Sequence, residues 1–423
     1  MHSRTTLRNY YEATTKVDLI TAPLDGDITT DVAIVGGGIT GVSAALHLAE
    51  RGFDAAVLEA RHIGWGASGR NGGQALPGFA AGQSVMNRLA GRERARLLWN
   101  LSLEAVELLH RRIAQFAIPC DPVRGYLHAA IKPRQVRELQ EAQEELAELG
   151  APVGRILQGG EARGRLDSPA YLALLEDPLS GHIHPLNYTL GLARAAQAAG
   201  ARLYTQSRVT KIERGSRIRL HTGAGIVSAR YLLLAGGAYL GGLAAPIAGY
   251  VMPVGTYIIA TEPRADIPAL IPGNEAVADL NFVLNYFRRS ADNRLLFGGR
   301  VSYSTLPPPG LARSMLKRAT RVFPQLKGAR VEFCWGGNVD ITRNRAPHFG
   351  RLAPDILFLQ GFSGHGVALT GLAGQLAAEA IAGQAERFDV FAAIPHARFP
   401  GGRRFRVPAL LLATTYYRLR DLL

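Results

Sequence analysis

The chain has 423 residues, which is longer than one typical domain and enough for two domains or one large interleaved unit. Hydrophobic residues make up 47% and charged residues 19%, so the chain can bury a sizeable core, and intrinsic disorder is excluded as its main state. The 48 Lys and Arg against 34 Asp and Glu give a net charge of +14, but the cations are scattered rather than clustered, so we expect no nucleic-acid partner.

The first strong pattern along the chain is a βαβ unit. A β-branched run, 31–35, is followed by a glycine-rich turn, a helical stretch over 42–51 and a second strand over 55–58. Gly52 stands where a helix stop is expected. A unit of about thirty residues with its glycine loop between strand and helix is typical of nucleotide-binding α/β domains.

The middle of the chain predicts helices first and strands afterwards. Residues 91–150 look largely helical, with mixed charge on a solvated face. Residues 202–220 and 230–234 alternate like strands, 257–303 predicts mainly strand and turn, and 313–323 predicts a helix. We find neither an internal repeat nor a low-complexity linker.

No membrane-crossing segment is expected. The N-terminal residues 1–31 are polar and aromatic and lack the apolar core of a signal peptide. Residues 231–261 carry no charge and are long enough to cross a bilayer, but glycines and prolines interrupt them repeatedly. We therefore interpret this stretch as two buried strands, 231–235 and 254–260.

Cysteine and histidine usage argues against structural metals and disulfides. The two cysteines, Cys120 and Cys334, are far apart and have no metal-ligand spacing, which excludes a disulfide framework and indicates a reducing, cytoplasmic compartment. His182 and His184 are metal ligands by type, but no third ligand has a suitable spacing. We expect both histidines to be structural and no metal to be bound.

The glycine loop after the first strand has the pattern of a dinucleotide site. Gly36 permits the tight turn, Gly38 lets the backbone approach a pyrophosphate, and Gly41 lets helix and strand pack closely. The phosphates would then lie at a helix N-terminus, which favours anions. Glu59 ends the second strand, where its carboxylate can accept hydrogen bonds from a ribose.

Two further segments favour FAD over a nicotinamide dinucleotide. Residues 64–74 are rich in glycine, hydroxyl and amide groups, which suits a loop around a phosphate and a ring edge. A second glycine loop, 360–366, joins a strand over 356–360 to a helix over 367–382. The N-terminus of that helix can face the pyrimidine end of a flavin and stabilise negative charge there.

The C-terminal stretch, 407–423, is apolar and contains Arg418 and Arg420. Such a segment can lie on a membrane surface, but we favour a docking segment over 391–423, with peripheral membrane contact as the alternative.

Motifs along nearly the whole chain resemble those of the FAD-dependent amine and amino-acid oxidoreductases related to D-amino-acid oxidase, glycine oxidase and sarcosine oxidase. Within this group they are most similar to the bacterial gamma-glutamylputrescine oxidases. The matching segments are Asp31–Gly38, Gly66–Gln74, Gly181–Leu186, Ala291–Leu295, Phe323–Gly328, Gln360–Val367, Glu386–Asp389, Phe399–Arg403 and Tyr416–Asp421.

The resemblance implies a mixed α/β fold with two interleaved domains. An FAD-binding, Rossmann-like domain is expected over 30–110, 186–245 and 335–390. A substrate domain with a mostly antiparallel sheet over the flavin is expected over 111–185 and 246–334.

The resemblance also implies a set of residues that bind FAD. Because neither cysteine lies in a motif for flavin attachment, we expect the FAD to be non-covalent. The expected FAD-binding residues are Gly36, Gly38, Ile39, Thr40, Glu59, Ala60, Ser68, Arg70, Asn71, Gly72, Gly73, Gln74, Val209, Gly236, Gly364, His365, Gly366 and Val367.

Candidate catalytic residues are His365, Tyr286 and Trp335. His365 precedes a helix at the expected flavin edge, where a cation would assist electron transfer to O2; the alternative is a helix cap. Tyr286 and Trp335 can form an aromatic wall around an aliphatic amine, or belong to the core. Arg288 and Arg300 can each bind a substrate carboxylate, although a solvated surface arginine is the more ordinary interpretation of either.

We expect a primary amine as substrate, gamma-glutamylputrescine or a related glutamylated polyamine, oxidised with O2 to aldehyde, ammonia and hydrogen peroxide. The charged residues Asp340 and Arg343 depart from the family pattern and leave the amine open. The alternatives are a sarcosine-, glycine- or D-amino-acid-type oxidase, and a dehydrogenase that passes electrons to a membrane quinone.

Overall fold

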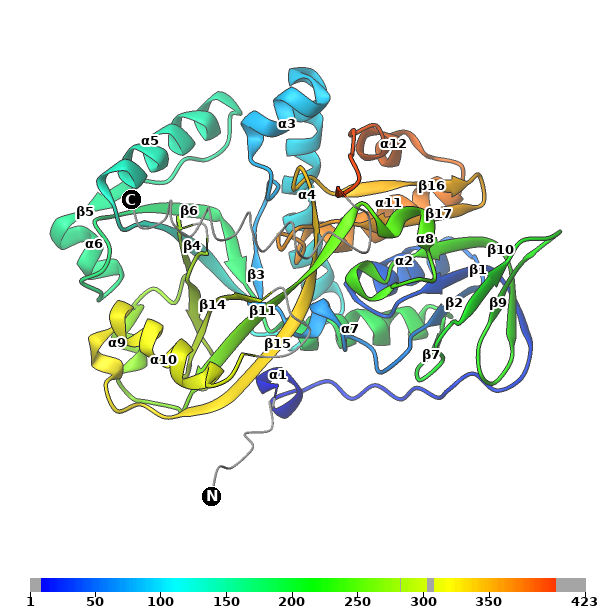
Figure 1. The fold of residues 1–423 in the computed structure, drawn as a ribbon, viewed down its shortest axis with the longest axis horizontal. Coiled ribbons are helices and arrows are strands. Elements are labelled where there is room, and N and C mark those ends of the chain that lie inside the picture. Colours follow the sequence, from blue (N-terminus) through cyan, green and yellow to red (C-terminus); the bar gives the residue numbers. More distant parts are fainter. Residues whose placement is uncertain (1–8, 282, 303–307, 401–423) are drawn as a thin grey trace.

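The structure is a computed structural model of the chain and describes residues 9–281, 283–302 and 308–400. Two β-sheets form its framework, one on each side of the view in Figure 1. Since the structure extends to residue 400, the part of the expected docking segment over 401–423 lies outside the described residues.

The first sheet carries the nucleotide-binding pattern. Its strands are β1 (Ile28–Val35), β2 (Ala55–Leu58), β7 (Arg202–Tyr204), β8 (Lys211–Glu213), β9 (Ile218–His221), β10 (Ile226–Leu234), β16 (His348–Ala353) and β17 (Ile356–Gln360). The order is β16-β17-β10-β1-β2-β7, with β9 beside β10 and β8 beside β9. β1 pairs in parallel with β2 and β10. Because both faces of such a central strand are covered, it needs a continuous apolar run such as 32–35.

Helices cover the first sheet, and two of them are in very close contact. They are α2 (Ile39–Ala49), α4 (Arg92–Gln115), α7 (Pro185–Ala198), α11 (Leu369–Ile381) and α12 (Glu386–Ala392), and their buried side chains form one core with the sheet. A Cβ on Gly374 of α11 would lie 2.5 Å from the Thr40 carbonyl oxygen and 2.6 Å from the Ala44 nitrogen in α2. A glycine is therefore required where these two helices cross.

The second sheet is mostly antiparallel. Its strands are β3 (Gln74–Ala75), β4 (Val123–Ala130), β5 (Ile156–Gln158), β6 (Ala173–His182), β11 (Val251–Thr261), β12 (Ala276–Asp279), β13 (Tyr286–Arg289), β14 (Leu295–Ser302) and β15 (Val331–Thr342). The order is β15-β11-β14-β13-β12-β4-β6-β3, with β5 beside β6, and only β12 and β4 pair in parallel along this path within the described residues.

The remaining helices lie mainly around the second sheet and the joint between the sheets (Figure 1). They are α1 (Tyr10–Ala13), α3 (Gln83–Ala90), α5 (Pro133–Glu148), α6 (Gly159–Arg165), α8 (Ala245–Ala248), α9 (Ile267–Leu270) and α10 (Leu311–Val322). α10 packs on the sheet through a core that contains Phe287, Phe297 and Phe323. The ring centroids of Phe287 and Phe297 are 5.7 Å apart in a stacked arrangement.

The chain passes back and forth between the sheets. β1 and β2 belong to the first sheet, β3 to β6 to the second, β7 to β10 to the first, β11 to β15 to the second, and β16 and β17 to the first. Every crossing brings a loop to the joint between the sheets. The predicted class, a mixed α/β fold with a Rossmann-like part and a mostly antiparallel sheet, is confirmed.

One secondary-structure prediction is correct for α4 and α5 but missed a strand between them. Residues 91–150 were expected to be largely helical, but β4 (Val123–Ala130) lies between α4 and α5 and pairs with β6 and β12. The segment Val-Arg-Gly-Tyr-Leu-His-Ala-Ala has no clear alternation, and long-range pairing rather than local preference makes it a strand.

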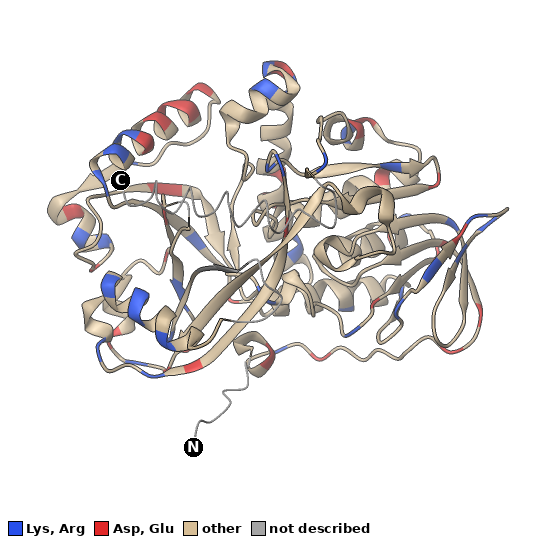
Figure 2. Ribbon diagram, in the orientation of Figure 1, with Lys and Arg blue, Asp and Glu red and all other residues tan. Residues whose placement is uncertain are grey.

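The uncharged stretches divide as predicted. Residues 231–261 contain the end of β10 and all of β11, and residues 356–378 contain β17 and most of α11. Among the described helices, none has both the length and the apolar character needed to cross a membrane. Figure 2 shows Lys and Arg dispersed over both sheets and interspersed with Asp and Glu.

Candidate active site

The turn between β1 and α2 spans residues 36–38 at the carboxyl edge of the first sheet. Gly36 has a φ of +114°, and a Cβ on it would lie 2.8 Å from the Ala235 carbonyl oxygen, just beyond the neighbouring β10. A Cβ on Gly41 would collide with the Gly36 carbonyl oxygen. The glycines therefore let α2 start close to the sheet, with its free N–H groups facing outward.

Glu59 follows β2 and points back at this turn. Its Oε2 accepts a hydrogen bond from the Gly37 nitrogen at 2.8 Å, and its Oε1 accepts one from the Arg61 nitrogen at 2.8 Å. The two bonds fix the carboxylate beside the glycine turn. From there it can accept hydrogen bonds from the ribose of a dinucleotide.

Ser68 tests whether the start of α2 suits an anion. Its Oγ accepts a hydrogen bond from the Ile39 nitrogen at 2.9 Å, and it lies 2.7 Å from the place that a Cβ on Gly38 would take. An oxygen acceptor thus already lies at the N-terminus of α2, and glycine leaves space beside it. The donors and the space fit the pyrophosphate of FAD.

The loop over 64–74 is held by its own polar groups. The Asn71 side chain accepts from the Gly73 nitrogen at 2.7 Å and donates to the Ala67 carbonyl oxygen at 2.9 Å. Gly73 has a φ of +77°, and a Cβ there would collide with the Ile183 carbonyl oxygen. This fixed, glycine-rich loop passes from the pyrophosphate end of the site into the second sheet through β3.

The second glycine loop, 361–367, approaches the same region from β17. His365 is half-buried, and its Nε2 lies 2.9 Å from the Pro77 carbonyl oxygen. Because a carbonyl only accepts, Nε2 carries the proton. Burial against the neighbouring loop lowers the pKa of His365, which favours a neutral imidazole.

A cavity of about 360 Å³ lies between these loops and the second sheet. This volume is within the range of small-molecule sites. Much of its wall is apolar, with Leu76, Val254, Leu284, Val339 and Ile341 among the lining residues. The predicted site residues that line it are Arg70, Asn71, Gly72, Gln74, Tyr286, Gly364, His365 and Val367.

The other predicted FAD-binding residues lie elsewhere in the site. Gly36, Gly38, Ile39, Thr40, Glu59, Ala60 and Ser68 gather around the turn after β1, while Gly73 and Gly366 belong to the two loops beside the cavity. Gly236 lies next to Gly36, at 3.0 Å from the position of a Cβ there. Val209 is buried in a core cluster that also contains Leu58.

Tyr286 is part of the cavity wall, and its ring lies between Gly72 and Gly298. A Cβ on Gly72 would be 2.9 Å from its ring, and a Cβ on Gly298, the partner of Tyr286 in β14, would collide with the ring. Burial raises the pKa of Tyr286, so the phenol stays protonated. The ring of Tyr286 therefore fills the space between the loop over 64–74 and β14.

Trp335 and Arg288 do not line the cavity. Trp335 is fully buried and donates from Nε1 to the Arg70 carbonyl oxygen at 3.1 Å. Arg288 was expected to be a solvated surface residue, which is wrong, because it is only 5% exposed. Its Nε donates to the Gly72 carbonyl oxygen at 2.8 Å and its Nη2 donates to the Ile183 carbonyl oxygen at 3.1 Å. Arg288 therefore stabilises the loop over 64–74. The side chain of Arg300 lies outside the described part.

Asp340 lies under the second glycine loop. Its Oδ2 accepts from the Gly361 nitrogen at 2.6 Å, and its backbone oxygen accepts from the Ser363 nitrogen at 3.0 Å. Burial raises the pKa of Asp340 to about 6, against the lowering effect of the backbone N–H groups. The extra charge noted in the sequence thus braces a loop and does not line the cavity.

His182 and His184 also make local contacts. His184 caps α7, with its Nδ1 accepting from the Asn187 nitrogen at 3.1 Å, and His182 Nε2 lies 2.8 Å from the Asn274 carbonyl oxygen. Burial lowers the pKa of each to about 3.

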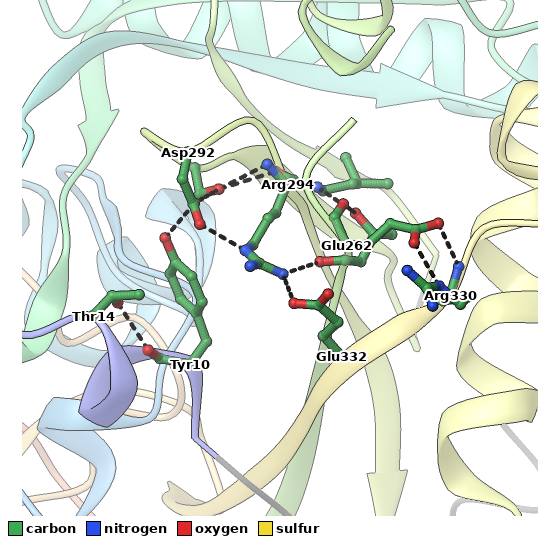
Figure 3. A network of polar contacts seen from close by, with 10 residues as sticks. Tyr10, Thr14, Glu262, Asp292, Arg294, Arg330 and Glu332 are labelled. Atoms are coloured by element: carbon green, nitrogen blue, oxygen red, sulfur yellow. Dashed lines mark hydrogen bonds and ion pairs between the residues drawn. The ribbon is translucent and has the colours of Figure 1, made fainter. Parts of the chain in front are cut away.

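The sequence analysis missed the N-terminal segment as part of the site. Asn9 donates to the Gly69 carbonyl oxygen at 3.1 Å, and Glu12 pairs with Arg70 at 3.1 Å, so the segment supports the loop over 64–74. Figure 3 shows Tyr10 anchored to Asp292, with its phenol oxygen 2.7 Å from Oδ1. The aromatic residues near the N-terminus were the signal for a buried segment.

Further cavity residues were missed for different reasons. Tyr126 belongs to β4, which was predicted as helix, and its phenol donates to Gln74 at 3.4 Å. Thr256, Asn338 and Arg345 also line the cavity. The positions of Thr256 and Asn338 depend on strand register, which the sequence pattern did not resolve.

The geometry is that of a flavin-dependent oxidoreductase, with a dinucleotide turn at one end and a largely apolar cavity at the other. The family of FAD dependent oxidoreductases matches residues 31–380. The gamma-glutamylputrescine oxidoreductase of Escherichia coli (strain K12) is 43% identical over 416 residues, which cover 98% of each chain. The probable oxidoreductase OrdL of Haemophilus influenzae is 38% identical over 423 residues, covering 98% of this chain and 97% of that protein.

Solved structures agree with this assignment. The crystal structure of glycine oxidase from Geobacillus kaustophilus has a TM-score of 0.72 and 25% identity, covering 84% of this chain and 95% of the other. This chain belongs to the FAD-dependent oxidoreductase family that contains these relatives. The predicted family, its oxidoreductase activity and FAD as cofactor are confirmed.

Proposed function

We propose that this protein oxidises the terminal primary amine of gamma-glutamylputrescine or a related glutamylated polyamine. The proposed reaction takes the amine, O2 and water to the aldehyde, ammonia and hydrogen peroxide. The observation that carries the proposal is the charge of the cavity wall. Arg70 and Arg345 line the cavity, and its described lining contains no Asp or Glu.

This charge pattern distinguishes a glutamylated amine from a free diamine. The second ammonium group of putrescine would enter a cavity whose wall has two guanidinium groups and no carboxylate. Its desolvation there would cost free energy, because no anionic partner would compensate for the lost water. A glutamyl group instead presents a carboxylate, which guanidinium groups bind well. The relative from Escherichia coli, whose name includes gamma-glutamylputrescine, supports the same substrate.

The chain's own residues would prepare the amine for oxidation. FAD, when bound, accepts a hydride from the carbon next to the amine nitrogen. Tyr286 and the apolar lining residues Leu76 and Val367 would exclude water and hold that carbon in place. The guanidinium groups in the wall lower the pKa of a nearby ammonium and so favour the neutral amine that reacts.

We assign His365 a role at the flavin edge as a neutral group. Its Nε2–H donates to the Pro77 carbonyl oxygen, so the orientation of the ring is fixed. In this proposal His365 joins the loop over 361–367 to the loop before α3. Trp335 would act only indirectly, through the backbone of Arg70.

We further propose that FAD is bound without a covalent link. Cys120 and Cys334 are both buried in core clusters, and neither lines the cavity. Burial raises the pKa of Cys120 to about 12 and that of Cys334 to about 11, which suppresses the reactive thiolate. Acid precipitation should leave the yellow flavin in the supernatant; flavin that precipitates with the chain would contradict this.

The electron acceptor and the location complete the proposal. O2 is the proposed acceptor and the cytoplasm the proposed compartment, with a small-molecule amine as the partner. The competing candidate, a dehydrogenase that serves a membrane quinone, would need the surface cations to face a bilayer, but they are dispersed.

An amine panel tests the function. The purified protein is incubated with gamma-glutamylputrescine, putrescine, sarcosine, glycine and D-alanine while oxygen uptake, peroxide and aldehyde are measured. We expect equal amounts of oxygen consumed and peroxide formed, with gamma-glutamylputrescine as the best substrate. Better turnover of sarcosine, glycine or D-alanine would contradict the substrate assignment. Turnover only with an added quinone would contradict the assignment of O2.

A further inference from the structure

We propose that the carboxylate of Asp340 lowers the redox potential of the bound FAD, a role that goes beyond the proposed amine oxidation. Asp340 lies in β15 between Val339 and Ile341, both of which line the cavity. Because side chains alternate along a strand, the Asp340 side chain points away from the cavity and into the protein. Only 8% of Asp340 is exposed, so its charge acts in surroundings that screen it poorly.

The second glycine loop lies between this carboxylate and the cavity. Oδ2 of Asp340 accepts from the Gly361 nitrogen at 2.6 Å, and its backbone oxygen accepts from the Ser363 nitrogen at 3.0 Å. Ser363, Gly364 and His365 of the same loop line the cavity. Because the sequence predicts that the pyrimidine end of the flavin lies beside this loop, the charge of Asp340 would act on the flavin across one layer of backbone.

Within the described part of the chain, no basic side chain pairs with Asp340. Burial raises its pKa to about 6, and the groups that oppose this rise are backbone N–H groups. By contrast, the buried carboxylate of Glu379 pairs with Arg387 at 3.2 Å. The charge of Asp340 is therefore not cancelled locally once it ionises. Bracing of the loop alone does not require this charge, because a neutral oxygen also accepts hydrogen bonds and costs less to desolvate.

The titratable groups packed around Asp340 are neutral near pH 7. Burial raises the pKa of Tyr239, in the turn after β10, and lowers that of His348, at the base of the loop, to about 3. The pKa of His365, within the loop, is also lowered by burial. On the other side, β11 places Pro253 opposite Asp340. Among these described neighbours, Asp340 is therefore the group whose charge changes between mildly acidic and neutral pH.

The sign of the effect follows from the charge of reduced FAD. Reduction adds two electrons and about one proton, so negative charge collects on the flavin. An ionised Asp340 repels that charge, which disfavours reduction and makes reduced FAD a stronger electron donor to its acceptor. Two unit charges about 10 Å apart at an effective dielectric constant of about 20 change an equilibrium constant roughly tenfold. By linkage, reduction must lower the acid dissociation constant of Asp340 by the same factor, so Asp340 takes up protons.

The test measures the midpoint potential of FAD in the full-length, FAD-loaded protein by anaerobic reductive titration against a reference dye, from about pH 5.5 to about pH 8. The charge-free variants are Asp340→Asn and the smaller Asp340→Ser. Thr342→Val is the matched control. Thr342 is 1% exposed beside the same loop, and its Oγ1 donates to the Ala346 carbonyl oxygen at 2.7 Å, so this variant removes a neutral hydrogen bond and no charge. Tm and the Kd for FAD are recorded for each protein.

Near pH 8 we expect Asp340→Asn to favour reduction about tenfold, which raises the midpoint potential by about 30 mV for a two-electron couple. The difference from the parent should shrink as the pH falls and should be small near pH 5.5, where Asp340 of the parent is mostly protonated. Between about pH 6 and pH 7 the parent should therefore take up more protons per two electrons than Asp340→Asn. Asp340→Ser should follow Asp340→Asn, and Thr342→Val should follow the parent.

Equal midpoint potentials of the parent and Asp340→Asn near pH 8 would overturn the proposal and leave Asp340 as a brace of the loop. An offset that is constant over the whole pH range, or an equal offset in Thr342→Val, would also overturn it, because a rearranged loop would then explain the shift. The same holds if neither charge-free variant retains FAD while Thr342→Val does, since the carboxylate would then be needed to assemble the site. None of these outcomes depends on the identity of the amine.

Discussion

At Glu59, two short hydrogen bonds from the backbone hold the carboxylate where a ribose would lie. We expect Glu59→Gln to weaken FAD binding about 10- to 100-fold, as expected for the loss of a charge-assisted hydrogen bond. Titration of apoprotein with FAD, followed by flavin fluorescence, measures this directly. Asp18→Asn, on an exposed residue of the N-terminal segment, is the control. Equal FAD affinity in parent and Glu59→Gln would show that Glu59 only braces the turn.

At Gly298, the missing side chain makes room for the Tyr286 ring. We expect Gly298→Ala to displace the ring and to lower the free energy of unfolding by about 1–3 kcal/mol, the usual cost of overpacking. Gly164→Ala is the matched control, since a Cβ there meets nothing within 4 Å. Chemical denaturation of both variants measures the difference. A Gly298→Ala protein as stable as the control would mean that the Tyr286 ring can adopt another position at no cost in stability.

At the scale of elements, α1 is fastened to the second sheet by a polar network (Figure 3). Tyr10 donates to Asp292, and Asp292 pairs with Arg294 at 2.6 Å, which in turn pairs with Glu332 on β15 at 2.5 Å. Burial raises the pKa of Tyr10 to about 12, so its phenol remains a donor at neutral pH. The network thus ties the segment under the loop over 64–74 to the sheet that forms the cavity.

A double-mutant cycle measures this tie. Tyr10→Phe and Asp292→Asn should each destabilise the protein, and the pair should show a coupling energy of about 1 kcal/mol. Unfolding by denaturant supplies the four free energies, and Glu262→Gln, whose contact is with Arg330 on the outside of the same network, serves as the control. Strict additivity of Tyr10→Phe and Asp292→Asn would indicate that the hydrogen bond contributes nothing to fastening α1.

The elements also show what the sequence could and could not predict. The turn after β1 and the one after β17 were predictable, because each glycine answers a local steric demand. β4 was not, because its strand state depends on pairing with β6 and β12 far along the chain. Tyr126 was missed as a lining residue for the same reason, since strand register decides which strand side chains reach the cavity. Arg288 was misjudged because charge alone does not reveal that its partners are backbone carbonyls.

At the scale of the whole molecule, buried histidines set the dependence of stability on pH. Burial lowers the pKa of His47 and His396 to about 4 and that of His182, His184 and His348 to about 3. Each histidine is neutral when folded but binds a proton when unfolded, so its stabilising effect is present above pH 6.5 and is lost as pH falls towards 4. The pKa values of Asp279 and Asp340 are raised to about 6, so the folded state holds more protons on these two groups than the unfolded state does. Their contribution to the free energy of unfolding therefore increases as pH falls below 6.

Because five such histidines oppose two carboxyl groups, unfolding near pH 5 should take up about three protons from these groups. The free energy of unfolding should then fall by about 4 kcal/mol per pH unit. Denaturation of the FAD-saturated protein at pH 6.5, 6.0, 5.5 and 5.0 gives the slope. His47→Gln should reduce the proton uptake on unfolding by about one, so the free energy of unfolding should fall less steeply with decreasing pH. Stability that stays constant or rises on acidification would contradict the burial of these histidines as neutral groups.

The account as a whole rests on selection of the amine by its far end, and one comparison tests it most directly. The values of kcat/KM are measured with the unmodified enzyme for gamma-glutamylputrescine, N-acetylputrescine and putrescine, whose far ends carry a carboxylate, no charge and an ammonium group. The wall containing Arg70 and Arg345 predicts that order of preference, with at least about 100-fold between the first and the last. A kcat/KM for putrescine equal to or above that for gamma-glutamylputrescine would contradict the account.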